Sequence, residues 1–231
     1  MRDIQSRHPL QADLSIANAW VGSDLPRIVP VSYHKDQDIV QQGARVDRII
    51  RMTRGIAMRY RVTRSGERHI FTFLFPGDVC FANCFSSGFT DHAIGAVTDV
   101  RTEQVEHATM RLSLLTRPDV NGLLWEMADR QDAAMRDLIA TLEHTHSSAR
   151  VVLLLIALGR RLQDPSDNRA PVVIPIIQSV LADASGMSMI HFNRSVNKLV
   201  DLGLAQTRRG GIVIPDLARI CTFASNVDLL N

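Results

Sequence analysis

One segment limits the possible folds of this chain more than any other. It is residues 178–199, with the sequence QSVLADASGMSMIHFNRSVNKL. Ala182 is small, as the close crossing of two helices requires. Gly186 follows where a tight turn needs a residue that tolerates positive φ. The segment therefore has the pattern of a helix-turn-helix, with an ordinary αα-corner in a protein core as the alternative. The apolar residues that would lock the two helices together are Leu181, Met187, Phe192 and Val196.

The second helix of this motif has the features of a DNA recognition helix. Ser188 is a good N-cap, and Gly203 ends the helix in the C-cap position. The first turn points outward, which is the part of a recognition helix that enters the major groove. Two basic residues follow on the same side. The predicted DNA-contacting residues of this helix are Ser188, Met189, Ile190, His191, Arg194 and Lys198.

A short hairpin is predicted directly after the second helix. Two short runs, residues 205–208 and the apolar residues 212–214, are joined by Arg209-Gly210-Gly211, which is the pattern of a β-hairpin. A hairpin in this place is a wing, and Arg208 and Arg209 at its tip could reach phosphates. The local pattern thus predicts a winged helix-turn-helix.

The chain has 231 residues, too many for a DNA-binding unit of about 70 residues alone, so a second domain is expected. Its net charge is only +2, so any DNA-binding basic surface has to be local. No apolar run approaches the about 20 residues of a membrane span, and the N-terminus lacks the apolar core of a signal peptide. Three cysteines argue against a disulfide framework. We therefore expect a cytoplasmic protein without membrane contact.

Residues 1–146 are expected to form the second domain. Residues 9–20 have the apolar face of a short amphipathic helix. From residue 27 to about residue 106, short β-type runs are separated by turn residues, which suggests an antiparallel barrel or roll. These runs are 39–40, 46–52, 56–62, 69–75, 93–97 and residue 105.

A long helix is predicted to begin at Pro118, because proline is favoured at the first helical position and the following Asp119 suits the positive end of the helix dipole. Residues at alternating spacings of four and three form a heptad seam flanked by charged positions. Self-pairing through this seam would turn a monomer into half of a two-fold DNA-binding protein. A helix that covers its own domain would show the same stripe. The predicted dimer seam is Val120, Leu124, Met127, Gln131, Ala134 and Leu138.

The DNA-binding domain is expected to cover residues 147–231. It opens with a helix over 148–163, followed by a polar loop that runs to residue 170. Residues 171–175 have the character of a strand that leads into the helix-turn-helix.

Several motifs occur in a fixed order along the chain. They are Phe75-Pro76-Gly77-Asp78 between strands, Arg117-Pro118-Asp119 and Ser148-Ala149-Arg150 at helix starts, and the segment 178–199. This order resembles the cyclic-AMP receptor/fumarate-nitrate regulator (Crp/Fnr) family of bacterial transcription factors over nearly the whole chain. It is most similar to a proteobacterial branch with Asp91-His92-Ala93-Ile94-Gly95 after the sensor strands and His191-Phe192-Asn193-Arg194 in the recognition helix. The resemblance implies an α+β fold with a cyclic-nucleotide-binding-like antiparallel β-roll, a long dimerisation helix and a winged helix-turn-helix.

The chain departs from the family where cyclic nucleotides bind. Members that bind them carry a Gly-Glu pair for the ribose and an Arg-Ser pair for the cyclic phosphate. Phe81-Ala82-Asn83-Cys84 stands in the first place and Thr90-Asp91 in about the second, where Asp91 would repel a phosphate. Cyclic AMP is therefore not expected as a ligand, although an arginine from elsewhere could substitute. The candidates for that role are Arg59, Arg61 and Arg68.

No other cofactor is indicated. The family's oxygen sensors hold an iron–sulfur cluster with N-terminal cysteines, and this chain has no cysteine before Cys80, so no cluster is expected. Cys80 and Cys84 could form a redox-sensing pair or be small buried hydrophobes. Nothing singles out a haem ligand. Glu143, His144 and His146 fit a solvated helix end better than a metal site.

The recognition helix departs from the family as well. In nucleotide-responsive members it begins Ser-Arg-Glu, and the Arg and Glu read guanine and cytosine edges. Met189 and Ile190 occupy these places and offer only apolar contact, for instance to a thymine methyl group. Arg194 matches the family's later arginine and is the candidate for a guanine or a phosphate. In an alternative interpretation, Met189 and Ile190 pack in the core and His191 contacts a base.

We interpret the chain as a non-enzymatic transcription regulator. Its expected partners are double-stranded DNA, a second copy of the chain, RNA polymerase and an unidentified small effector. The alternative is a small-molecule-binding protein whose degenerate helix-turn-helix serves only protein–protein contact. No phosphate loop, nucleophile motif or metal-ligand spacing indicates an enzyme. The candidate effector pocket is Asn83, His92, Met127 and Gln131.

Overall fold

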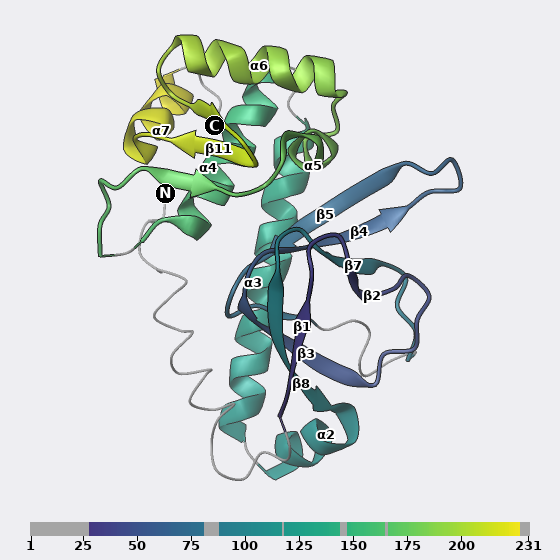
Figure 1. Ribbon diagram of the computed structural model, residues 1–231. Helices are drawn as coiled ribbons and strands as arrows, with labels where there is room; N and C mark the ends of the chain where they lie inside the picture. The colour runs from purple at the N-terminus through teal and green to yellow at the C-terminus, as the bar shows by residue number, and fades with distance from the viewer. Residues whose placement is uncertain (1–27, 81–87, 117, 144–146, 165, 227–231) are drawn as a thin grey trace. The chain divides into compact units, whose positions relative to one another are not determined.

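The computed structural model describes residues 28–80, 88–116, 118–143, 147–164 and 166–226 (Figure 1). The chain divides into two compact units. Among the described residues, the first consists of those within 28–61 and 73–133, and the second of those within 62–72 and 134–226. Residues 9–20, where a helix is predicted, lie outside the described residues, as does residue 146 at the predicted domain boundary.

The N-terminal part of the described chain is built on β-strands. Their bounds are β1 Val29–Tyr33, β2 Asp38–Val40, β3 Arg48–Arg54, β4 Ala57–Val62, β5 Arg68–Leu74, β6 Val79–Cys80, β7 Ala93–Ala96 and β8 Val100–Glu106. They form two four-stranded sheets with the orders β1-β8-β3-β6 and β2-β7-β4-β5. The pairs β1–β8, β3–β8, β3–β6, β2–β7 and β4–β7 are antiparallel, which confirms the predicted antiparallel architecture.

Apolar side chains from both sheets form the core of this region. The buried polar group Gln104 is accommodated because its side-chain amide donates a hydrogen bond of 2.8 Å to the Tyr33 hydroxyl. Cys80 belongs to the core and is 1% exposed. The core cluster consists of Ile39, Val40, Val46, Ile50, Met52, Ala57, Leu74, Cys80, Ile94, Ala96 and Val100.

Three elements of this region do not follow from the sequence pattern: β1, β6 and the helix α2 (His107–Thr116). β1 contains Pro30, which a strand tolerates at the edge of a sheet, where β1 lies. β6 has only two residues and forms because it pairs with β3, with Cys80 opposite Ile50. Such short elements depend on a distant partner strand rather than on local periodicity.

The helix α3 spans Pro118–Glu143 without interruption, which confirms its predicted start. Two residues of the predicted dimer seam, Ala134 and Leu138, are partly buried. The side chains of the other seam residues lie outside the described residues. They are Val120, Leu124, Met127 and Gln131.

Large apolar side chains of α3 are exposed to solvent. Trp125 is 71% exposed and Ile139 is 59% exposed. They are two heptads apart, so helical periodicity places them on one face of α3. Leu142, one turn beyond Ile139, is 39% exposed. This face differs from the seam predicted from the sequence.

The second unit contains a three-stranded antiparallel sheet and four further helices among the described residues. Their bounds are α4 Ser147–Leu162, β9 Val172–Ile174, α5 Gln178–Ala184, α6 Met189–Asp201, β10 Gln206–Arg208, β11 Gly211–Ile214 and α7 Leu217–Asn226. The strand order is β10-β11-β9, so the strand predicted at 171–175 completes the wing sheet.

The apolar helix α4 lies at the centre of this arrangement. It contacts α6, α7 and β9, and Leu155 near its middle is fully buried. Helix α7 does not follow from the sequence analysis, and it buries Leu217, Ile220 and Ala224. Among the residues that the structure describes, no helix has the length and hydropathy of a membrane span.

Candidate nucleic-acid interface

The predicted turn between α5 and α6 is present. Gly186 has φ +62°, the left-handed conformation for which glycine is favoured. The buried Ser185 hydroxyl donates to the carbonyls of Leu181 and Ala182 at 2.9 and 3.0 Å, and the Met187 amide donates to Ala182 at 3.0 Å. These bonds satisfy the last carbonyl groups of α5 and fix the direction in which the chain enters α6.

Helix α6 begins at the predicted N-cap, and its C-cap is Leu202, one residue before the predicted Gly203. Ser188 is its N-cap, and the Ser188 hydroxyl accepts a hydrogen bond from the His191 amide. Gly203, with φ +66°, follows the last turn, and its amide donates to the Val200 carbonyl at 2.9 Å. The face toward the core buries Phe192 and Val196 completely. One face of α6 is therefore held rigidly against the unit.

The opposite face of α6 is exposed. Ile190 is 72% exposed and Met189 is 40% exposed, and His191 is exposed beside them. The alternative in which Met189 and Ile190 pack in the core is therefore wrong. A shallow groove runs along this face. Its lining residues are Ile190, Asn193, Arg194, Asn197, Lys198 and Asp201.

The two asparagines in this groove are absent from the residues predicted from the sequence. Asn193 and Asn197 are one turn apart on α6, next to Arg194. The side-chain Oδ1 of Asn193 is buried, and no donor for it is found within the described ranges. Spacing from Ile190 and Arg194 at three residues would have identified both asparagines as neighbours of the groove.

The wing is a hairpin of β10 and β11, with Thr207 opposite Ile212. The prediction placed Gly211 in the turn, but the structure places it in β11, paired with Arg208, so the turn consists of Arg209 and Gly210. Arg208 and Arg209 are exposed at the tip, as predicted. With Arg194 and Lys198 of α6, this unit offers several exposed cationic side chains for phosphates.

Two long-range arginine contacts hold this unit together, and sequence reasoning missed both. Arg219 of α7 donates to the carbonyls of Leu202 and Gly203 at 3.0 and 3.3 Å, at the end of α6. Arg68 donates twice to Asp183 Oδ2 of α5, at 3.0 and 2.6 Å. Arg68 is therefore engaged by a carboxylate, contrary to its suggested role as a substitute phosphate ligand.

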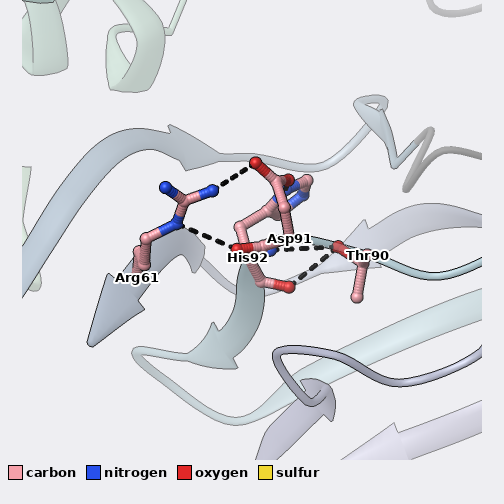
Figure 2. A network of polar contacts seen from close by, with 4 residues as sticks. All are labelled: Arg61, Thr90, Asp91 and His92. Atoms are coloured by element: carbon pink, nitrogen blue, oxygen red, sulfur yellow. Dashed lines mark hydrogen bonds and ion pairs between the residues drawn. The ribbon is translucent and has the colours of Figure 1, made fainter. Parts of the chain in front are cut away.

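His92, a candidate effector residue, belongs to a polar network in the β-roll (Figure 2). Its Nδ1 lies 2.8 Å from Asp91 Oδ1. Arg61 forms an ion pair with the other oxygen of Asp91, and its Nε donates to the Asp91 carbonyl at 3.0 Å. The Thr90 hydroxyl donates to the His92 carbonyl at 2.8 Å. Asp91, expected to repel a phosphate, thus neutralises Arg61, which is the second of the suggested substitute arginines.

Burial decides the protonation of His92. Desolvation lowers the pKa of His92 below its ordinary value, and this outweighs the hydrogen bond with Asp91, which raises it. The same hydrogen bond lowers the pKa of Asp91. Burial also lowers the pKa of His107 at the start of α2. Both histidines are therefore neutral near pH 7, with an ionised Asp91 beside His92.

The stability of the fold should decrease when the pH falls below 6.5, the ordinary pKa of histidine. The unfolded chain binds protons at these histidines more readily than the folded chain, so acid favours unfolding in this window. Asp91 contributes a further loss of folding stability only when the pH falls below 3.8, its ordinary pKa. In urea titrations at about pH 7.5 and about pH 5.5, His92→Gln should reduce the decrease seen in wild type. The exposed His69→Gln variant is the control, and an equal decrease in all three proteins would contradict the assignment.

Asn83 and Cys84 lie outside the described residues, as do the side chains of Met127 and Gln131. Arg59 is buried, 8% exposed. In the described ranges, no group of three side chains is placed to hold a metal ion.

Comparisons with known proteins identify a domain match and a relative of this chain. Residues 149–223 match the Crp-like helix-turn-helix domain. The nitrogen fixation regulation protein FixK of Bradyrhizobium diazoefficiens is 27% identical over 172 residues, which are 74% of this chain and 71% of FixK.

Solved structures show the same fold. FixK2 from Bradyrhizobium japonicum superposes with a TM-score of 0.74 at 21% identity, covering 85% of this chain and 96% of FixK2. A CRP/FNR family transcriptional regulator from Thermus thermophilus gives 0.68 at 20% identity, covering 85% and 98% of the two chains. The Crp-like helix-turn-helix domain and the FixK relative support a sequence-specific DNA-binding transcription regulator of the Crp/Fnr type, and the solved structures show the same fold.

Proposed function

We propose that the protein regulates transcription as a homodimer that inserts one α6 helix from each copy into the major groove. The observation that carries this proposal is the two-faced character of α6. Phe192 and Val196 are fully buried, whereas Arg194 and Lys198 are exposed along the groove. A two-fold dimer reads half-sites about one helical turn apart, so we expect an inverted-repeat operator with that spacing.

The exposed face of α3 supports the dimer. Trp125 and Ile139 are large apolar side chains that expose most of their surface to water. Their spacing of two heptads is that of residues on one side of a coiled coil. Pairing of α3 with the same helix of a second copy would remove both side chains from water. Dimerisation through α3 thus has a physical driving force.

The exposed residues of α6 and the wing have distinct expected roles. Arg194 is placed for a base edge or a phosphate, and Lys198, Arg208 and Arg209 for phosphates. The Ser188 hydroxyl accepts from His191, so its own proton is available for a phosphate oxygen. Positioning contacts to phosphates fix the register of the helix, and base contacts supply sequence preference.

The β-roll is proposed to respond to a small effector other than a cyclic nucleotide, or to have no effector. The ion pair of Arg61 with Asp91 supports this, because a carboxylate already pairs with one of the arginines that could bind an anionic ligand. The protein is proposed to act in the cytoplasm, without enzymatic activity and with RNA polymerase as a further partner. Native mass spectrometry of the purified protein would identify a retained effector by its added mass.

Replacing Arg194 with alanine should weaken specific DNA binding by about 1–3 kcal/mol and relax the preference at one base position. The measurement is a fluorescence-anisotropy titration of the full chain with an operator obtained by in vitro selection. The control is Arg169→Ala, which removes an exposed arginine from the loop before β9. Unchanged affinity and unchanged base preference for Arg194→Ala would contradict the assignment.

The same titration at different salt concentrations tests the proposed function itself. A protein with 6–10 phosphate contacts loses about 10³–10⁵ in affinity between 50 and 200 mM salt. A helix-turn-helix that serves only protein–protein contact forms no specific complex at any salt concentration. That outcome would overturn the proposed function.

A further inference from the structure

The groove on α6 has one apolar wall in an otherwise polar surface. Ile190 is 72% exposed, and the other lining residues are Asn193, Arg194, Asn197, Lys198 and Asp201. An isolated exposed apolar residue is common on protein surfaces. Ile190, however, lies in the first turn of the helix proposed to contact DNA, where exposed side chains face a base edge or the backbone.

The position of Ile190 is fixed by the structure around it. Ser188 caps the helix two residues earlier, and Phe192 anchors the same turn in the core with no exposed surface. A β-branched side chain in a helix has one strongly preferred χ1 rotamer, so the Ile190 methyl groups have a defined direction. Arg194 follows four residues later on the same face. Ile190 and Arg194 therefore approach neighbouring base pairs.

The chemistry of Ile190 restricts what it can recognise. Major-groove edges present hydrogen-bond donors, acceptors and one apolar group, the C5-methyl of thymine. An isoleucine side chain satisfies neither the N4 amino group of cytosine nor the acceptors of guanine, and covering those groups leaves them without partners. Of the four bases, thymine alone gains contact area from it.

We propose that Ile190 selects a thymine, through its 5-methyl group, in each operator half-site at the base pair beside the one contacted by Arg194. This inference rests on the proposed DNA-reading role of α6 and adds a defined base to it. Met189 is not assigned this role, because its flexible side chain is less exposed and its position on α6 is about 100° away.

Replacement of thymine by deoxyuridine tests the inference, because it removes the 5-methyl group and nothing else. The operator is first obtained by in vitro selection with the full-length protein, and each thymine of both half-sites is then replaced in turn. One position should lose about fourfold in affinity per half-site, the value expected for one buried methyl group. Deoxyuridine at the other positions should have little effect.

Two variants of Ile190, with one of Met189 as the control, link that position to the Ile190 side chain. Ile190→Ala should remove the difference between thymine and deoxyuridine at that position, whereas Met189→Ala should keep it. Ile190→Glu should shift the preference there to cytosine, because a carboxylate accepts a hydrogen bond from N4. Since Ile190 is mostly exposed, both of its variants should melt at the wild-type temperature, which thermal denaturation checks.

The outcomes separate this inference from the proposed function. Binding could be specific and salt-dependent while replacement of each thymine by deoxyuridine leaves the affinity unchanged. That result would overturn the role of Ile190 and leave the proposed function intact. A methyl-dependent position that persists in Ile190→Ala would overturn it too. Absence of any specific complex would overturn the proposed function and this inference together.

Discussion

Replacing Gly211 with alanine is expected to lower the stability of the second unit by about 3 kcal/mol, because the new methyl group has no space. A Cβ at this position would lie 2.1 Å from the carbonyl oxygen of Ile174, with other backbone atoms of Ile174 and Pro175 at 3.1 and 3.2 Å. Backbone cannot move aside as a flexible side chain does. Strand β11 would have to separate from β9, which exposes the fully buried Ile212 and Ile214.

The neighbouring glycine provides the matched control for this prediction. Gly210 has φ +87°, but no atom lies within 4 Å of a Cβ built there. Gly210→Asn should therefore cost much less, since asparagine tolerates positive φ. Thermal denaturation should show a decrease in melting temperature of roughly 15 °C for Gly211→Ala and a small one for Gly210→Asn. Equal melting temperatures would show that the wing does not depend on close approach at Gly211.

Replacing Ile139 with glutamate should convert the proposed dimer into monomers. The side chain is 59% exposed in a single chain, so its replacement leaves the monomer fold intact. In a pair of α3 helices, two carboxylates would face each other across the interface and lose their water. A monomer engages one half-site at a time, so operator affinity should fall at least about hundredfold. Sedimentation velocity reports the mass, and anisotropy titration reports the affinity.

Two further variants decide which face of α3 pairs. Ile139→Leu keeps an apolar side chain and should remain dimeric. Leu138→Glu lies about 100° around the helix, on the seam predicted from the sequence. A dimer that survives Ile139→Glu and dissociates with Leu138→Glu would place the interface on the predicted seam and contradict the one proposed from exposure.

The parts that sequence reasoning predicted are those with a local physical cause. Ser188 caps α6, Gly186 makes the turn before it, and Pro118 starts α3, each through the conformational preference of one residue. Strands β2, β3, β4, β5 and β7 of the roll also followed from short apolar runs between turn residues. The exposed position of Ile190 on α6 follows from helical periodicity combined with the buried Phe192.

The features that sequence reasoning missed depend on contacts between residues that are distant in the chain. Arg219 reaches the end of α6 from a helix that the apolar pattern does not predict, and Arg68 reaches Asp183 across 115 positions. Arg61 lies 30 positions before Asp91, and the composition of either segment does not indicate that they pair. Contacts of this kind are decided by the fold as a whole.

The pairing of β9 with β11 has a consequence for exchanging DNA-binding modules between related regulators. β9 precedes the helix-turn-helix in the chain, yet it covers the inner edge of the wing, with Val173 opposite Val213. A chimera joined between β9 and α5 would combine a foreign strand with this wing or leave the wing with none. An uncovered strand edge of this kind invites pairing with other molecules and aggregation. Junctions for such chimeras therefore belong before Val172.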